Sequence, residues 1–207
     1  MSTRRMLCLN GDRYFVAALM KACRGLAIVV ATSVLSPWCA AADGSQREAL
    51  ATIASIDITR YMGRWYEVAK FPNWFQRRCV SDTRAEYQIA AAGAVKVLNR
   101  CRNGSGEFDE ASGMARQIGD ATSPRLKVRF APDWLSFLPF VWGDYWVIDL
   151  DANYHLVAVS EPKREYLWIL SRTPRPDAQQ YSALLQRLQA RGLDVSRLES
   201  TRHTQPD

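Results

Sequence analysis

The sequence predicts an all-β protein, an eight-stranded up-and-down antiparallel barrel with a C-terminal α-helix packed on its outside. Residues 63–71 and 165–174 each have the residue pattern of a β-strand. Short, evenly spaced alternating segments lie between them, joined by hairpin-length connections. Eight such strands close into a barrel whose interior can hold one small ligand.

The strands are expected one after another along this region, each bounded by turn residues. In the fifth strand, Leu126 and Val128 alternate with Arg125 and Lys127, so one face is apolar and the other is polar. The same alternation marks the other segments. The expected strands are residues 64–71, 82–90, 94–102, 110–119, 125–130, 144–150, 154–160 and 165–171.

Segments on either side of the strands complete the predicted domain, which spans residues 57–207. Residues 57–62 are expected to cap the bottom of the barrel. After the last strand, Asp177 is a helix N-cap, and apolar residues at helical spacing follow until Gly192. The apolar stripe of this helix needs the outer face of the sheet to cover it. Residues 197–203 can add a final strand.

The first and last strands carry residues that can close one end of the barrel. Gly63 precedes Trp65 by two residues, at a tight turn into the first strand, and Arg172 ends the last strand. Closure makes these strands neighbours, so the Arg172 guanidinium can lie flat on the Trp65 indole. We expect this cation–π contact to stabilise the closed end by roughly 0.5–2 kcal/mol.

These residues resemble the shared motifs of the lipocalin family. Gly63 and Trp65 match its Gly-x-Trp motif, and Arg172 matches the arginine at the end of its last barrel strand. A third motif, Thr-Asp-Tyr, is matched only by Asp151. The longer stretches around both ends are most similar to the bacterial outer-membrane and apolipoprotein D branch. The resemblance covers about residues 57–203 and implies a ligand-binding barrel.

Residues 1–42 are expected to be a secretory signal peptide. From Met20, a candidate true start, a basic segment is followed by an apolar run and by small residues suited to cleavage after Ala42. Lipid attachment at Cys39 is the alternative, although the residue before it is not small. Residues 43–56 then form a tether. The pattern predicts an exported protein, in the periplasm or on the periplasmic face of the outer membrane.

Charge argues against a nucleic-acid partner. The net charge of the whole chain is +6. Residues 1–42 hold five basic residues and one acidic residue, so the net charge falls to +2 without them. The remaining arginines are scattered through alternating strands instead of forming a basic stripe. We therefore expect no nucleic-acid binding.

Outside the expected signal peptide the chain has two cysteines, Cys79 and Cys101. Two cysteines in an exported domain favour a disulfide. In the chain-entropy model, closing a loop of this length contributes roughly 3 kcal/mol. Two unrelated free thiols are the alternative.

A ligand is expected to contact inward-facing side chains. By resemblance to the family, Trp168 lines the cavity. Tyr87 is also inward, and its hydroxyl can meet a ligand head group, while Asn99 or Arg100 near the rim can complement a carboxylate or phosphate. The expected ligand-binding residues are Tyr87, Val97, Asn99, Phe130 and Trp168.

An aromatic mouth is expected at the end opposite the closed one. Residues 71–78 and 132–142 are apolar connections that flank the same opening in a meander. Exposed apolar loops suit lipid uptake or contact with outer-membrane lipid. The alternative is that the longer loop folds back and plugs the barrel. The mouth residues are Trp74, Phe75, Trp134, Phe137, Phe140 and Trp142.

The sequence therefore favours a non-catalytic protein that binds, stores or transports a small hydrophobic or amphipathic ligand, such as a fatty acid or lysophospholipid. We identify no catalytic residues, no metal-ligand spacing and no cofactor motif. Two alternatives stay open. One is an enzyme of this fold that uses a cavity thiol at Cys101, and the other is an interaction module of the cell envelope with no small ligand inside.

Overall fold

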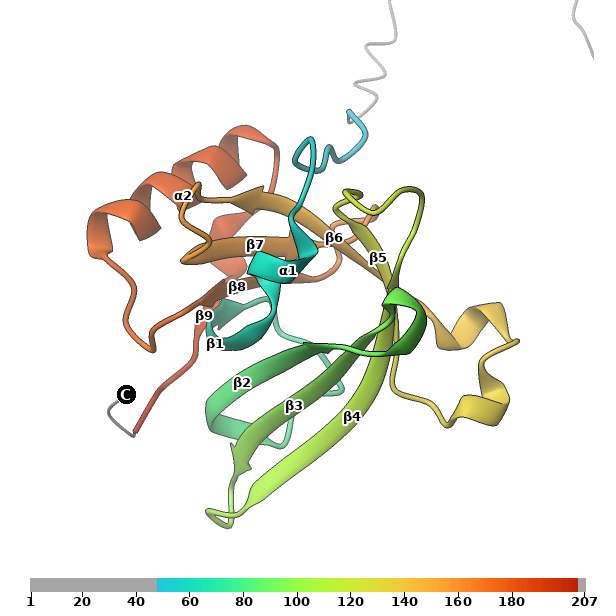
Figure 1. Ribbon diagram of the computed structural model, residues 1–207. Helices are drawn as coiled ribbons and strands as arrows, with labels where there is room; N and C mark the ends of the chain where they lie inside the picture. The colour runs from blue at the N-terminus through green and yellow to red at the C-terminus, as the bar shows by residue number, and fades with distance from the viewer. Residues whose placement is uncertain (1–47, 205–207) are drawn as a thin grey trace, which may run out of the picture. The chain divides into compact units, whose positions relative to one another are not determined.

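The computed structural model describes residues 48–204 (Figure 1). The expected signal peptide over 1–42, with Met20 and Cys39, lies outside the described residues, as do residues 43–47 of the expected tether over 43–56. Within the described residues, no helix is both long enough and apolar enough to cross a membrane.

Strand β1 (Gly63–Lys70) closes the barrel because it pairs with β2 (Cys79–Ile89) and with β8 (Leu167–Ser171). Every other barrel strand pairs antiparallel with the next one along the chain. The predicted barrel is confirmed. Its remaining strands are β3 (Val95–Asn103), β4 (Phe108–Gln117), β5 (Arg125–Arg129), β6 (Gly143–Leu150) and β7 (Leu156–Ser160).

Side chains of β8 alternate between two apolar layers, as expected from its sequence. Leu167 and Ile169 face outward and pack in one cluster with Leu184 and Leu188 of helix α2 (Ala178–Ala190). Trp168 points the other way and packs against the cluster inside the barrel. The helix covers the outer surface beside β7 (Figure 1), as predicted.

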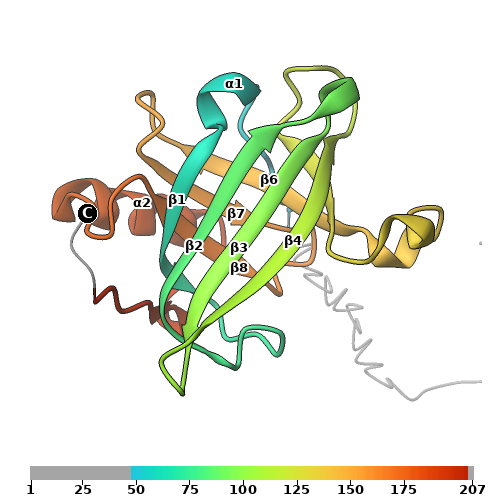
Figure 2. The same ribbon diagram turned by 60° about the horizontal axis from the view of Figure 1, so that its bottom comes forward.

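Helix α1 (Ile58–Tyr61) caps one end of the barrel (Figure 2). The Asp57 side chain begins the helix by accepting hydrogen bonds from the backbone N–H groups of Thr59 and Arg60. Short 3₁₀ turns occur in the connections and are too brief to form separate layers. They are Ala91–Gly93, Asp133–Leu135, Pro139–Val141 and Val195–Arg197.

The closed end is built around Trp65, which is fully buried. Its indole Nε1 donates a hydrogen bond to the Tyr61 carbonyl at 2.8 Å, and the Arg172 guanidinium carbon lies 3.9 Å from the ring centroid. Arg172 also donates to the backbone carbonyls of Arg60, Arg64 and Tyr154. One side chain therefore connects β8 to α1, to β1 and to the β6–β7 turn.

The C-terminal tail fills a gap between β1 and β2 toward the opposite end. Direct pairing between these strands stops at Tyr66 and Arg84. Beyond that point, β9 (Glu199–Ser200) pairs with β1, and Thr204 donates two hydrogen bonds to the Asp82 carboxylate. The final strand expected over residues 197–203 is therefore only two residues long, and both backbone bonds, at Thr201 and Arg202, and side-chain bonds hold the residues that follow it.

Those bonds determine how Asp82 titrates. Burial of Asp82 opposes its ionisation, but hydrogen bonds from Thr204, Ser81 and Arg102 outweigh this effect and hold the pKa of its carboxyl well below the usual range. Asp82 also has a positive φ of 55°. The β2 bulge at this position thus aims a charged acceptor at the tail.

We predict that Arg172→Ala lowers the free energy of unfolding by about 1–3 kcal/mol, because the cation–π contact and several hydrogen bonds are lost together. Arg172→Lys should recover only part of the loss, since an ammonium group lacks the planar fork. Denaturant unfolding of the two variants measures this. A variant that keeps its stability but loses ligand binding would show that the ligand occupies this end.

Candidate functional site

The barrel interior is filled near α1 and open toward the other end. Close to α1, Trp65, Val95 and Val147 are almost completely buried. Toward the mouth, Asn99 and Ala111 are paired across β3 and β4 on the inward face, yet both keep solvent-accessible surface. Inward-facing side chains can be exposed only through the barrel's own opening. The mouth half of the interior is therefore open to solvent at these two positions.

The five expected ligand-binding residues all lie on the inward face. Tyr87, Val97 and Trp168 belong to or pack against the interior cluster, and Asn99 shares the face of Val97. Phe130 lies over Gly113, because a Cβ atom on this glycine would sit 2.7 Å from the Phe130 ring. Arg100, in contrast, lies outside the barrel in an ion pair with Glu110. The inward face is where all five lie, and their contact with a ligand stays a prediction.

The connection between β5 and β6 carries three strongly exposed aromatic side chains. Phe137 is 76% exposed and Phe140 is 80% exposed. Trp134 is 72% exposed. The connection from β5 to β6 projects away from the barrel (Figure 1), so this loop does not plug it. Trp142 plays a different part from the one expected, because it packs between Arg116 and Arg129 at the base of the loop.

The loop between β1 and β2, residues 71–78, lies over the other side of the mouth (Figure 2). The Phe75 ring contacts the rings of Tyr166 and Trp168, with centroids 5.6 and 6.2 Å away. Trp74 packs edge-on against Phe75 and is 68% exposed. Phe75 therefore reaches the rings of the barrel wall, whereas Trp74 stays in solvent.

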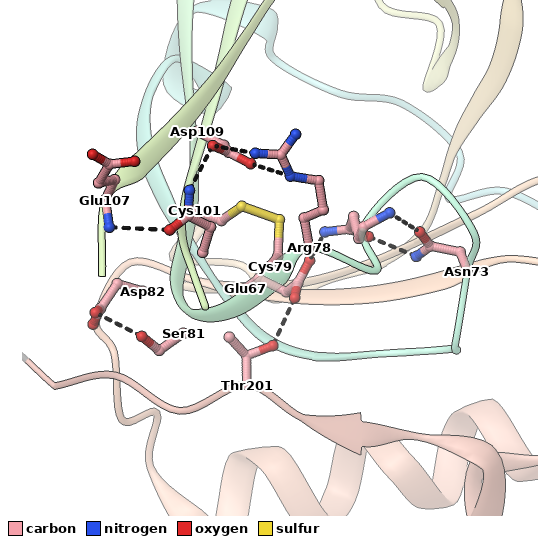
Figure 3. The surroundings of a disulfide bond; sticks show 12 residues. Glu67, Asn73, Arg78, Cys79, Ser81, Asp82, Cys101, Glu107, Asp109 and Thr201 are labelled. Atoms are coloured by element: carbon pink, nitrogen blue, oxygen red, sulfur yellow. Dashed lines mark hydrogen bonds and ion pairs between the residues drawn. A yellow bond between two sulfur atoms is a disulfide. The ribbon is translucent and has the colours of Figure 1, made fainter. Parts of the chain in front are cut away.

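Gln76 fastens this loop to the barrel. Its Nε2 donates to Glu67 at 2.6 Å, and its Oε1 accepts from Trp168 Nε1 at 3.0 Å and from Asn73 at 2.6 Å. Thr201 donates to the other oxygen of Glu67, as Figure 3 shows. Burial raises the pKa of the Glu67 carboxyl, and the hydrogen bonds from Thr201 and Gln76 offset part of that shift.

Cys79 and Cys101 form the predicted disulfide, with their Cα atoms 5.4 Å apart (Figure 3). It joins the mouth ends of β2 and β3. Beside it, Asp109 of β4 accepts hydrogen bonds from Arg78 and Asn103. Cys101 is therefore not the free thiol that the enzyme alternative requires.

Three hydroxyl groups meet inside the barrel above α1. The Tyr145 hydroxyl oxygen lies 2.7 Å from that of Tyr61 and 3.1 Å from that of Tyr87. Burial raises the pKa of Tyr87 to about 12, and it raises the pKa values of Tyr61 and Tyr145 well above the usual value. These three residues, here called the tyrosine triad, are neutral at ordinary pH.

Sequence reasoning found only Tyr87 of the triad. Tyr145 alternates with Val147 in β6, so strand parity alone could have placed it inward. Tyr61 belongs to the capping helix, where no strand periodicity applies. Gln76 was missed for a similar reason, since its partners become visible only when the loop is folded. In residues 48–204 no group of three or more His, Cys, Asp or Glu side chains is arranged to hold a metal ion.

A family model described as a lipocalin-like domain matches residues 56–203, which include both closing strands, the cavity and the tail. The chain belongs to the lipocalin-like family. This confirms the resemblance expected from Gly63, Trp65 and Arg172. The closed barrel described above agrees with membership of this family.

Two related lipocalins show how far the similarity extends. Temperature-induced lipocalin-1 of Arabidopsis thaliana is 37% identical over 159 residues, 76% of this chain and 84% of that protein. Outer membrane lipoprotein Blc of Escherichia coli strain K12 is 37% identical over 146 residues, 70% of this chain and 78% of that protein. The similarity therefore covers most of each relative.

Among solved structures, insecticyanin from the tobacco hornworm Manduca sexta superimposes with a TM-score of 0.57. The match covers 73% of this chain and 82% of that chain, at 18% sequence identity. At this identity the likeness shows the shared fold alone.

Gln76→Ala should loosen the loop over residues 71–78, because Glu67, Trp168 and Asn73 each lose a hydrogen-bond partner. We expect a loss of about 1–3 kcal/mol in the free energy of unfolding and faster amide exchange in this loop. Arg77→Ala, at the exposed neighbouring position, is the matched control. Equal exchange rates in the two variants would show that Gln76 does not hold the loop.

Proposed function

We propose that this lipocalin binds and carries a fatty acid or lysophospholipid in the bacterial cell envelope. The observation that carries the proposal is the barrel interior, which is sealed beside Trp65 and open at a mouth surrounded by aromatic side chains. Trp168 and Phe130 supply apolar wall near that mouth. A lipocalin fold and its relatives support the binding of a small hydrophobic ligand in general.

Burial of an acyl chain would supply the binding energy. A chain that removes about 300 Å² of apolar surface from water gains roughly 7 kcal/mol, from which the costs of association must be subtracted. The polar Asn99 side chain lies on the same inward face as Val97, near the mouth. Its side-chain amide can accept a hydrogen bond from a polar group of the ligand, or donate one to it.

Contact with outer-membrane lipid is the second part of the proposal. Trp134, Phe137 and Phe140 expose most of their surface on one loop, and Trp74 is exposed on the other loop at the mouth. Aromatic side chains on a projecting loop can enter the interface of a bilayer, where apolar rings leave water. A ligand could then pass between membrane and barrel without crossing bulk water.

A location in the cell envelope would bring the protein to outer-membrane lipid. The similar Escherichia coli protein is named an outer membrane lipoprotein. We propose that residues 1–42 are removed as a signal peptide, that residues 43–56 act as a tether whose later part is packed on the barrel through Leu50 and Ile56, and that Met20 is the true start. Lipid attachment at Cys39 is the alternative for the N-terminus, and the periplasm or the periplasmic face of the outer membrane is the proposed compartment.

The ligand proposal predicts a specific loss at Trp168. Trp168→Ala should weaken fatty-acid binding by about 1–3 kcal/mol, because apolar contact with the chain is lost. Trp146→Ala is the matched control, since Trp146 packs in the outer cluster under α2. Titration calorimetry well below the melting temperature compares the two. Equal affinities in folded variants would place the ligand away from Trp168.

The membrane proposal predicts that the Phe137→Ser and Phe140→Ser double variant binds vesicles of phosphatidylethanolamine and phosphatidylglycerol at least about tenfold more weakly. Ile118→Ser is the control, because Ile118 is 42% exposed in the β4–β5 connection at the closed end. Cosedimentation with vesicles measures both. Similar losses in the two variants would contradict docking through the mouth.

A further inference from the structure

The tyrosine triad has more hydrogen-bond donors than its own bonds consume. Each phenol carries one hydrogen that it can donate. Tyr145 forms one bond with Tyr61 and one with Tyr87, and within residues 48–204 the three hydroxyl groups form no other. Two bonds use two of the three hydrogens, in whichever direction they run. One hydroxyl hydrogen is therefore left without an acceptor.

Within residues 48–204, no protein acceptor bonds to that hydrogen, and apolar side chains pack in the same cluster as the triad. Ala85, Val97, Leu126 and Val147 belong to the same buried cluster and have only apolar side chains. A buried donor without an acceptor carries a desolvation penalty that a single well-placed oxygen atom would remove. An oxygen-bearing ligand would thus be favoured over a pure hydrocarbon at this point.

The triad is within reach of a molecule that enters the mouth. Tyr61 and Tyr87 are only 2% and 7% exposed, whereas Tyr145 keeps more of its surface accessible. Tyr145 also lies on the inward face of β6, two residues from the mouth end of that strand. The open inward positions at Asn99 and Ala111 lead from the rim into the same interior.

We propose that the tyrosine triad is a binding site for a neutral oxygen acceptor at the inner end of the ligand, such as an ester carbonyl or a protonated carboxyl group. The inference rests on the proposed function and gives the ligand a direction. The oxygen function lies deep in the barrel, and the hydrocarbon chain extends past Trp168 toward the aromatic mouth. Of the two ligands considered above, a fatty acid fits this direction, since the charged head group of a lysophospholipid does not suit an apolar floor.

We expect a neutral acceptor because the Arg172 guanidinium, which acts electrostatically on Tyr61 and Tyr87, is already engaged. It stacks on Trp65 and donates to the carbonyls of Arg60, Arg64 and Tyr154. One hydroxyl donor cannot compensate an ionised carboxylate removed from water. A carbonyl oxygen needs only that one donor.

Infrared spectroscopy of bound methyl dodecanoate, isotope-labelled at its carbonyl carbon, tests the proposal. In the wild-type complex the carbonyl stretch should lie below its frequency in dodecane, because an O–H group donates to it. The triple variant Tyr61→Phe, Tyr87→Phe and Tyr145→Phe should restore the hydrocarbon value and weaken the ester about three- to tenfold. Its affinity for dodecane should change less than about twofold, which also shows that the variant is folded.

Tyr166→Phe removes a hydroxyl at the mouth and tests the opposite direction, while Tyr181→Phe on the outer face of the barrel is the neutral control. The proposal expects neither variant to move the carbonyl frequency. A hydrocarbon-like frequency in the wild type, or a shift caused by Tyr166→Phe, would overturn the proposed direction while leaving the proposed function intact. Failure of the wild type to bind either the ester or dodecane would overturn both.

Discussion

The contact between Arg172 and Trp65 is the constraint on which the rest of the barrel depends. A barrel has no free edge only if its first and last strands meet, and Arg172 bonds the last strand to backbone carbonyls of α1, β1 and the β6–β7 turn around a buried indole. Because this end is filled, the interior can open only at the other end. The loops at that end, residues 71–78 and 130–142, therefore control access to the cavity.

The open end is held by different chemistry from the closed one. The disulfide between Cys79 and Cys101 fixes β2 to β3, and the tail through Thr204 and Asp82 spans the gap beside β1. Gln76 then ties the loop over the mouth to the cavity wall. These covalent and polar attachments leave the aromatic rings of the wall available to a ligand, since no apolar plug is needed to keep the strands together.

Strand parity explains how much of this could be predicted from the sequence. The alternation of Trp168 with Leu167 and Ile169 placed one side chain inside and two under α2, and the same rule found the inward face of β3. Parity fails where the chain leaves a strand. Trp142 was assigned to the mouth by its apolar neighbours, but two flanking arginines hold it on the outer surface, and the bonds of Gln76 depend on a loop conformation that no periodicity encodes.

The central claim is that the open half of the barrel holds an acyl ligand. The most direct test is mass spectrometry of lipid extracted from the exported protein after purification without detergent, together with native mass spectrometry of the intact complex. The account predicts about one fatty acid or lysophospholipid per chain, displaced by added fatty acid. An empty barrel that also fails to take up added fatty acid would contradict it and favour an interaction module of the cell envelope.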